Sequence, residues 1–281
     1  MTGVARRSPH FPLRLDQLQP RRTVPAADEP GAMPVHGARM LRPQRPLQAQ
    51  ASARPEMPTG LGMDSADVRL RMVQRLRQLG VRHETLLRAF ADVPRHQFLD
   101  AALVTQAYED TSLPIGHAQT ISKPSVVARM IELLFGGATA RAQAQLGRVL
   151  EIGTGCGYQA ALLTRLGRMV VSVERIKALH ERARTALAAT RSEGVRLVYG
   201  DGKRGHPPNA PYDSIIAAAG GDELPQAWLD QLALGGRLVV PMRPPGAEGQ
   251  VLVVVDRTEH GFQHSRHEEV NFVPLKSGLI A

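Results

Sequence analysis

The sequence contains a single cysteine, Cys156, among its 281 residues, and aromatic residues make up only 4% of the chain. One cysteine excludes a disulfide within the chain and is typical of a reducing compartment. No apolar run approaches the roughly 20 residues that a membrane-spanning helix requires. The N-terminus also lacks an apolar stretch followed by small residues, so we expect no secretory signal. These absences predict a cytoplasmic protein that does not span a membrane.

Acidic residues are outnumbered by basic ones, and the formal net charge is +9. Such an excess can indicate nucleic-acid binding. Residues 1–62 hold nine arginines and four acidic residues, a net +5, so the other 219 residues carry only +4. That larger part contains no basic run and no aromatic-rich RNA-binding motif. We therefore expect no nucleic-acid partner.

The first 62 residues contain ten of the 21 prolines and show no helical or strand periodicity. Such a segment cannot bury enough apolar surface to offset the entropy lost on ordering. We predict a disordered extension over residues 1–62 and one domain over residues 63–281. A nucleic-acid tether, a transit segment and a translation start at Met63 remain open for the extension, although scarce serine argues against transit.

Short apolar segments alternate with helical ones from Val149 onward, which predicts a parallel sheet covered by helices on both faces. The expected strands are Val149–Ile152, Val170–Val173, Val195–Tyr199, Ser214–Ala218, Leu238–Val240 and Val251–Val255. The expected helices between them are Gln159–Leu166, Ile176–Thr190 and Leu224–Leu234. A polar segment, Gln263–Val273, is expected to close the sheet as an antiparallel hairpin with Val251–Val255. The fold class is therefore α/β, a doubly wound and mostly parallel sheet.

Two helices are predicted before this region. The first is capped by Asp64 and Ser65 and closed by Gly80, and the second ends before Val93. Residues 108–119 are expected to form a loop, because Pro114 and Gly116 interrupt them. Another helix is expected over Ser125–Leu134, with Pro124 near its start, where proline suits a first turn.

A glycine-rich loop follows the first expected parallel strand directly. Gly153, Gly155 and Gly157 let the backbone turn sharply and approach a ligand closely. A dinucleotide site would require glycine at position 158, which is Tyr158, and no Gly-Lys-Ser/Thr follows as in a phosphate-binding P-loop. The carboxylate of Glu151, just before the loop, would repel a pyrophosphate but suits the amino group of a methionine moiety.

Acidic residues also stand at the next two strand ends. Glu174 ends the second strand, where a carboxylate can accept hydrogen bonds from both ribose hydroxyls. Asp201 and Gly202 end the third strand, where they are well placed beside an adenine ring. Together with Glu151 and the three glycines, these residues predict a site for S-adenosyl-L-methionine in a class I methyltransferase fold.

The segment before this site, Tyr108–Pro124, resembles the substrate-side motif of the protein-L-isoaspartate O-methyltransferases. The resemblance extends over residues 63–281. Supporting segments are Val93–Phe98, Val173–Ile176, Gly200–Gly202, Ala210–Asp213, Gly235–Leu238 and Phe272–Leu275. Three positions depart from the family pattern: Ala118 replaces a glycine, Lys123 replaces a glutamine, and Cys156 replaces the commoner serine. Ala118 would restrict its loop if that position requires a positive φ.

The resemblance implies transfer of a methyl group to the α-carboxyl group of L-isoaspartyl residues in damaged proteins and peptides, followed by uncatalysed succinimide formation. It marks Ser122 as catalytic, with Gln119 and Thr120 shaping the same site. A carboxylate acceptor is ionised at neutral pH, so no general base is needed. The alternative role for Ser122 is a helix cap before Pro124.

Two further functional classes stay open: a methyltransferase with a small-molecule or RNA acceptor, and a basic binding protein on a degenerate fold. No metal site is expected, because His264 and His267 lack a further ligand at zinc-site spacing. We expect a monomer, since a protein-sized substrate needs open access.

Overall fold

The structure, a computed structural model, describes residues 66–192 and 194–281. The predicted extension over residues 1–62, the domain start at Met63 and the cap at Asp64 and Ser65 lie outside the described residues. Within them, no helix is long and apolar enough to cross a membrane.

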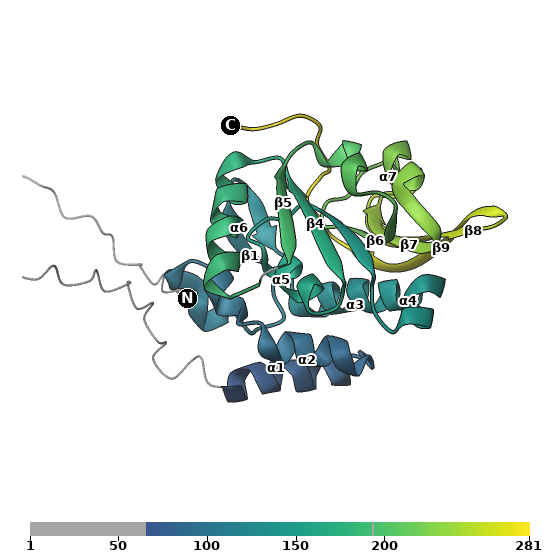
Figure 1. Cartoon of the computed structure of the whole chain (residues 1–281). Helices are drawn as coiled ribbons and strands as arrows, with labels where there is room; N and C mark the ends of the chain where they lie inside the picture. The colour runs from purple at the N-terminus through teal and green to yellow at the C-terminus, as the bar shows by residue number, and fades with distance from the viewer. Residues whose placement is uncertain (1–65, 193) are drawn as a thin grey trace, which may run out of the picture. The chain divides into compact units, whose positions relative to one another are not determined.

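A seven-stranded sheet in the order β5-β4-β3-β6-β7-β8-β9 forms the centre of the described chain. Strands β5, β4, β3, β6 and β7 are parallel, and β8 and β9 extend the sheet as antiparallel strands (Figure 1). The strands are β3 (Arg148–Ile152), β4 (Met169–Glu174), β5 (Val195–Tyr199), β6 (Tyr212–Ala217), β7 (Leu232–Met242), β8 (Gln250–Thr258) and β9 (Gly261–Val270). This confirms the predicted α/β class and the C-terminal antiparallel hairpin.

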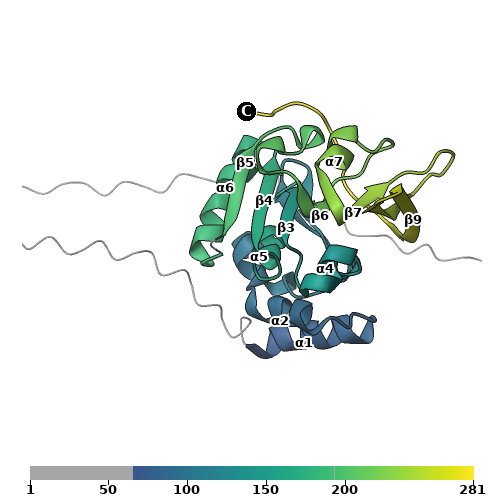
Figure 2. The same cartoon turned by 45° about the vertical axis from the view of Figure 1, so that its right-hand side comes forward.

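Helices cover both faces of this sheet. The α-helices are α1 (Ala66–Gln78), α2 (Glu84–Asp92), α3 (Pro124–Phe135), α4 (Ala138–Gln143), α5 (Tyr158–Thr164), α6 (Lys177–Ala189) and α7 (Gln226–Gln231). Short 3-10 helices are η2 (Arg95–Phe98), η3 (Ala101–Gln106), η4 (Gly202–Arg204) and η5 (Pro207–Asn209). Helices α1 and α2 form an outer layer that packs on α3 and α5, as Figure 2 shows at the bottom of the view.

Successive residues of each strand enter different cores, because side chains alternate across a sheet. Val149 and Val170 pack with α3, α5 and α6 in one buried cluster. Leu150 and Val171 pack with Trp228 of α7 in the second cluster, on the other face. Burial on both faces explains why the strands are continuously apolar in sequence.

The predicted loop over residues 108–119 is wrong in part, because its second half is a β-hairpin. Strand β1 (Leu113–Gly116) pairs antiparallel with β2 (Gln119–Ile121). The two turn residues, His117 and Ala118, have φ values of 53° and 54°. Positive φ at both central positions is the geometry of a tight hairpin turn, and Pro114 is tolerated because a two-stranded ribbon leaves its edge unpaired.

The C-terminal third also differs from the sequence-based prediction. The helix expected over Leu224–Leu234 is limited to α7, because Leu232 already begins β7 beside Tyr212. The strand expected to reach Val273 ends at Val270. Beyond it the chain leaves the sheet and crosses toward the ends of the parallel strands, where Gly220 N donates to Val273 O at 2.9 Å.

Candidate active site

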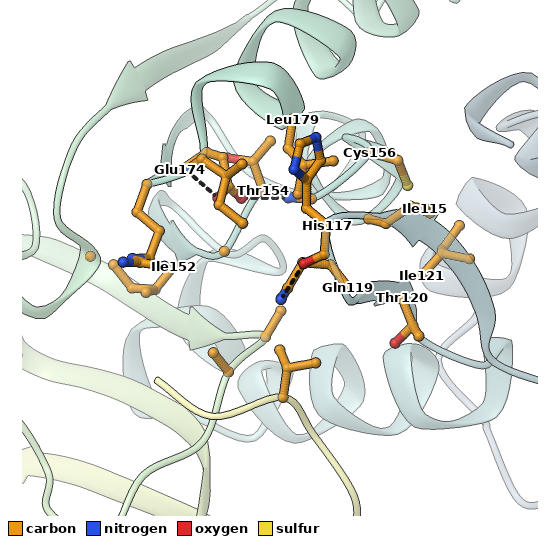
Figure 3. Close-up of a pocket in the computed structure, with 18 of the residues that line it drawn as sticks. Ile115, His117, Gln119, Thr120, Ile121, Ile152, Thr154, Cys156, Glu174 and Leu179 are labelled. Carbon is orange, nitrogen blue, oxygen red and sulfur yellow. Dashed lines mark hydrogen bonds between the residues drawn. The ribbon is translucent and has the colours of Figure 1, made fainter. Parts of the chain in front are cut away.

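A cavity of about 310 Å³ opens at the carboxyl ends of β3 and β4. The neighbours of β3 are β4 and β6, so the sheet changes winding direction at this point, where α/β sheets bind ligands. Figure 3 shows His117 and Gln119 of the hairpin facing Thr154 of the glycine loop and Glu174 at the end of β4. The volume is that of a small-molecule site.

The glycine loop supplies part of the cavity wall through its backbone. Gly153 and Gly155 line the cavity with φ values of 89° and 56°, which glycine adopts without strain. Gly157 does not line it. A Cβ on Gly157 would come within 3.2 Å of Leu187 and 3.3 Å of Ala183, so this glycine lets α5 pack against α6.

Glu174, which lines the cavity at the end of β4, holds the glycine loop in place. One carboxylate oxygen accepts a hydrogen bond from Gly155 N at 2.9 Å, and the other accepts one from Ile176 N at 2.9 Å. A carboxylate has about four lone-pair sites, so each oxygen can accept a further hydrogen bond. Glu174 can therefore fix the loop and bind a diol at the same time.

Glu151 lies behind the cavity wall and does not line it. The side chain is fully buried, and Ser172 Oγ donates to its Oε2 at 2.5 Å. Ser172 is also 2.5 Å from the hydroxyl of Thr154, which does line the cavity. The other carboxyl oxygen has no hydrogen-bond partner among the described residues, and burial raises the pKa of Glu151 to about 8.

Gly202 lines the cavity, whereas Asp201 does not. A Cβ on Gly202 would come within 2.6 Å of Ile152, so only glycine fits there. Asp201 instead accepts from Lys203 N at 3.0 Å and from Gly278 N at 2.8 Å. Its carboxylate thereby fastens the C-terminal segment across the strand ends.

The C-terminal segment was not expected at the site from the strand and helix pattern. Pro274, Leu275, Lys276 and Ile280 line the cavity. Ile280 is hydrogen-bonded through its backbone N to Arg175 O and through its O to Lys177 N, both at 2.9 Å. Thr154 and Gln159 also line the cavity. Neither was predicted from the sequence, because an uncharged polar side chain beside the glycine loop carries no distinct signal for ligand binding.

Ser122 lies between two cavities. It lines the first, and it also lines a second cavity of about 410 Å³ with Ser112, Lys123 and the end of β9. The helix-cap alternative is wrong, because Lys123 occupies the cap position of α3. The first-turn amide of Ser125 donates its hydrogen bond to Asp110 Oδ1 at 2.8 Å, so the Ser122 hydroxyl is not used for capping.

Gln119 and Thr120 line the first cavity as predicted beside Ser122. The Gln119 amide donates to His117 O at 3.3 Å and to Ala118 O at 3.1 Å, which braces the hairpin turn (Figure 3). His264 and His267 lie on β9, away from this cavity lining. Among the described residues, no three His, Cys, Asp or Glu side chains are grouped as metal ligands would be.

An open, mostly parallel sheet with a glycine loop and an acidic strand end at its switch point defines a Rossmann-like methyltransferase of class I. The profile of the family described as protein-L-isoaspartate(D-aspartate) O-methyltransferase matches residues 68–279. The chain belongs to this family.

Relatives named protein-L-isoaspartate O-methyltransferase cover most of the chain. The one from Methylibium petroleiphilum is 56% identical over 281 residues, 99% of each chain. The one from Leptothrix cholodnii is 62% identical over 244 residues, 84% of each chain.

Solved structures agree with these relatives. A protein-L-isoaspartate O-methyltransferase aligns with a TM-score of 0.67 and 31% identity, over 75% of this chain and 67% of that one. A Plasmodium falciparum protein described by the same activity, in complex with S-adenosyl-L-homocysteine, aligns with a TM-score of 0.63 over 74% and 98%. At 22% identity, the second likeness supports the fold alone.

Proposed function

We propose that this protein transfers a methyl group from S-adenosyl-L-methionine to the α-carboxyl group of L-isoaspartyl residues in damaged proteins, initiating their repair through a succinimide. The observation that carries the proposal is the place of Ser122, which lines both the first and the second cavity. A donor in the first cavity and an acceptor in the second would meet at its hydroxyl.

The first cavity fits the cofactor. Gly153 and Gly155 present backbone where an adenosyl or methionine moiety can approach closely. Glu174 keeps lone pairs for ribose hydroxyls, and Gly202 leaves room beside the adenine. Glu151 acts through Ser172 and Thr154 on the methionine end. When bound, S-adenosyl-L-methionine supplies an electrophilic methyl group on a sulfonium sulfur.

The protein's contribution to the chemical step is orientation. The acceptor carboxylate is ionised at neutral pH, so its oxygen can attack without a general base. Ser122 Oγ donates a hydrogen bond to one carboxylate oxygen and directs the other toward the methyl group. The positive end of α3, which begins two residues later, favours the anion at this place. Gln119 and Thr120 close the site on the hairpin side.

Paired peptides test the acceptor. The protein is incubated with tritiated cofactor and two peptides that differ only in an isoaspartyl or an aspartyl residue. We expect label on the isoaspartyl peptide alone, released as methanol when the ester forms its succinimide. Equal labelling of both peptides, or of neither, would favour another acceptor such as a small molecule or RNA.

We further propose that the enzyme acts as a cytoplasmic monomer without a nucleic-acid partner. Open access to the cavity at Ser122 suits a protein-sized substrate, and the charge excess outside residues 1–62 is only +4. Light scattering coupled to size exclusion should report a mass near 30.5 kDa. Salt-sensitive retention on DNA or RNA by the full chain would contradict the last part of the proposal.

A further inference from the structure

A buried arginine stands directly behind Ser122. Arg95 of η2 has no exposed surface. Its Nε donates to Ala107 O at 2.8 Å, and its Nη2 donates to Ser122 O at 2.8 Å. The guanidinium carbon lies 4.8 Å from the ring centroid of Tyr158, a residue that lines the first cavity. Arg95 itself is outside the cavity lining, so it contacts the site from behind.

No carboxylate of the described residues forms a direct ion pair with Arg95, although Asp110 is near enough to favour the charged guanidinium. Among the described residues, no carboxylate oxygen lies within 4.0 Å of its guanidinium. Neither its Nη1 nor the Tyr158 hydroxyl has a partner in good hydrogen-bond geometry among the described residues, although the hydroxyl is near enough to favour the charged guanidinium. Burial lowers the pKa of Arg95, but an arginine side chain stays protonated in proteins. A buried charge without a direct ion pair is costly, which favours a role for the guanidinium in its position behind Ser122.

Arg237 shows how this fold treats a structural arginine. It forms a two-point ion pair with Asp256 at 2.7 and 2.8 Å, and it donates to Leu133 O at 2.9 Å. Both arginines thus donate to a backbone carbonyl near α3: Arg95 to Ser122 O just before the helix, and Arg237 to Leu133 O in its last turn. Arg237 has a carboxylate within ion-pair distance, whereas no carboxylate in the described part of the chain lies that close to Arg95.

We infer that Arg95 is a positioning residue for methyl transfer: it fixes Ser122 through its carbonyl and adds positive charge behind the place where the acceptor carboxylate is oriented. The inference rests on the proposed function, because Ser122 is the residue that orients the acceptor there. The carboxylate brings the negative charge when it reaches the Ser122 hydroxyl. Arg95 donates its hydrogen bonds to Ala107 O and Ser122 O and not to the glycine loop, so we expect cofactor binding to depend little on it.

Two substitutions separate geometry from charge. Arg95→Lys keeps a positive charge but cannot donate to both Ala107 O and Ser122 O. Arg95→Met removes the charge as well as the two hydrogen bonds. Arg237→Lys is the matched control, a similar loss at an arginine remote from the cavity. Each variant is assayed for kcat and KM with the isoaspartyl peptide, for affinity to S-adenosylhomocysteine by calorimetry, and for Tm.

We expect Arg95→Lys to lower kcat about tenfold, with KM nearly unchanged, because misplacement of a reacting group is costly. Arg95→Met should lower kcat about 100-fold and also raise KM, since the attraction for the carboxylate is gone. Both variants should bind S-adenosylhomocysteine within about twofold of the wild type, while Arg237→Lys lowers Tm without a comparable loss of kcat. In Arg95→Ala, a third variant that leaves space for the ion, added guanidinium should restore part of kcat.

The results that overturn the inference are distinct. If the wild type is active and both Arg95→Lys and Arg95→Met keep its kcat, the role of Arg95 is refuted. The proposed function is then unaffected. If the Arg95 variants lose kcat and cofactor affinity by equal factors, and guanidinium does not restore kcat, Arg95 has only a structural role. This result also refutes the inference. A wild type that methylates neither peptide refutes the proposed function and this inference together.

Discussion

Replacing Glu151 with glutamine should stabilise this protein at neutral and alkaline pH. The carboxyl group is fully buried, and Ser172 donates a hydrogen bond to one of its oxygens. The other oxygen has no partner in good hydrogen-bond geometry among the described residues, although the nearby Gln159 amide lowers the pKa of Glu151 in part. Burial raises the pKa of Glu151 from 4.5 to about 8. The folded protein therefore holds a proton that the unfolded chain releases across this range.

The sign of the pH dependence follows from proton linkage. A carboxyl whose folded pKa is raised contributes its full stability below pH 4.5 and loses it as the pH rises through 8. At pH 7 the difference of 2.5 units corresponds to about 3 kcal/mol of unfolding free energy that Glu151 has given up. Glutamine has nearly the same shape and does not ionise. The unfolding free energy of Glu151→Gln should therefore not fall by these 3 kcal/mol as the pH rises.

Urea unfolding at pH 5, 6, 7 and 8 measures the effect. The difference in unfolding free energy between Glu151→Gln and the wild type should grow by about 3 kcal/mol over this range. Glu132→Gln is the control, because Glu132 accepts from Arg82 N and His83 N at 2.6 and 3.1 Å, and its loss should destabilise at every pH. A wild-type curve parallel to that of Glu151→Gln would show that Glu151 is ionised in the folded protein and would refute the reasoning.

Three other substitutions test the site. Ser122→Ala should lower kcat about 100-fold with the affinity for S-adenosylhomocysteine nearly unchanged, because one donor to the reacting carboxylate is lost. Ser125→Ala is the control. Wild-type turnover in Ser122→Ala would exclude the proposed role. Ala118→Gly should raise the urea-derived unfolding free energy by about 1 kcal/mol, since the φ of 54° strains alanine, and an unchanged value would argue against strain. Lys123→Gln should raise KM for the isoaspartyl peptide about twofold at low salt and leave it unchanged at high salt, and a salt-independent change would point away from attraction by charge.

The amino-acid sequence by itself determined the main chain path of the α/β sheet. Continuous apolar strands, helical spacing and glycine-terminated strands are local signals, because they follow from burial on both faces and from backbone freedom. They were sufficient to predict the parallel strands, the glycine loop and the place of Glu174. The family motif before Pro124 in turn indicated Ser122.

The tertiary structure decided which of these residues face the cavity. Three predicted residues lie close in sequence to lining residues but do not line the cavity. Glu151 lies behind the wall, Gly157 lets α5 pack on α6, and Asp201 holds the C-terminal segment. The His117–Ala118 turn and the approach of Ile280 also depend on contacts between distant segments. No periodic pattern encodes such contacts, because they arise only when the strands and the hairpin are packed together.

Arg95 shows the same division most clearly. The sequence places it in a motif shared with the family, but charge and hydrophobicity alone predict an exposed arginine. Only the packed structure buries its guanidinium against Ser122 O and Tyr158. Local sequence therefore determined the elements and the cofactor loop, whereas long-range packing decided how Ser122 is held.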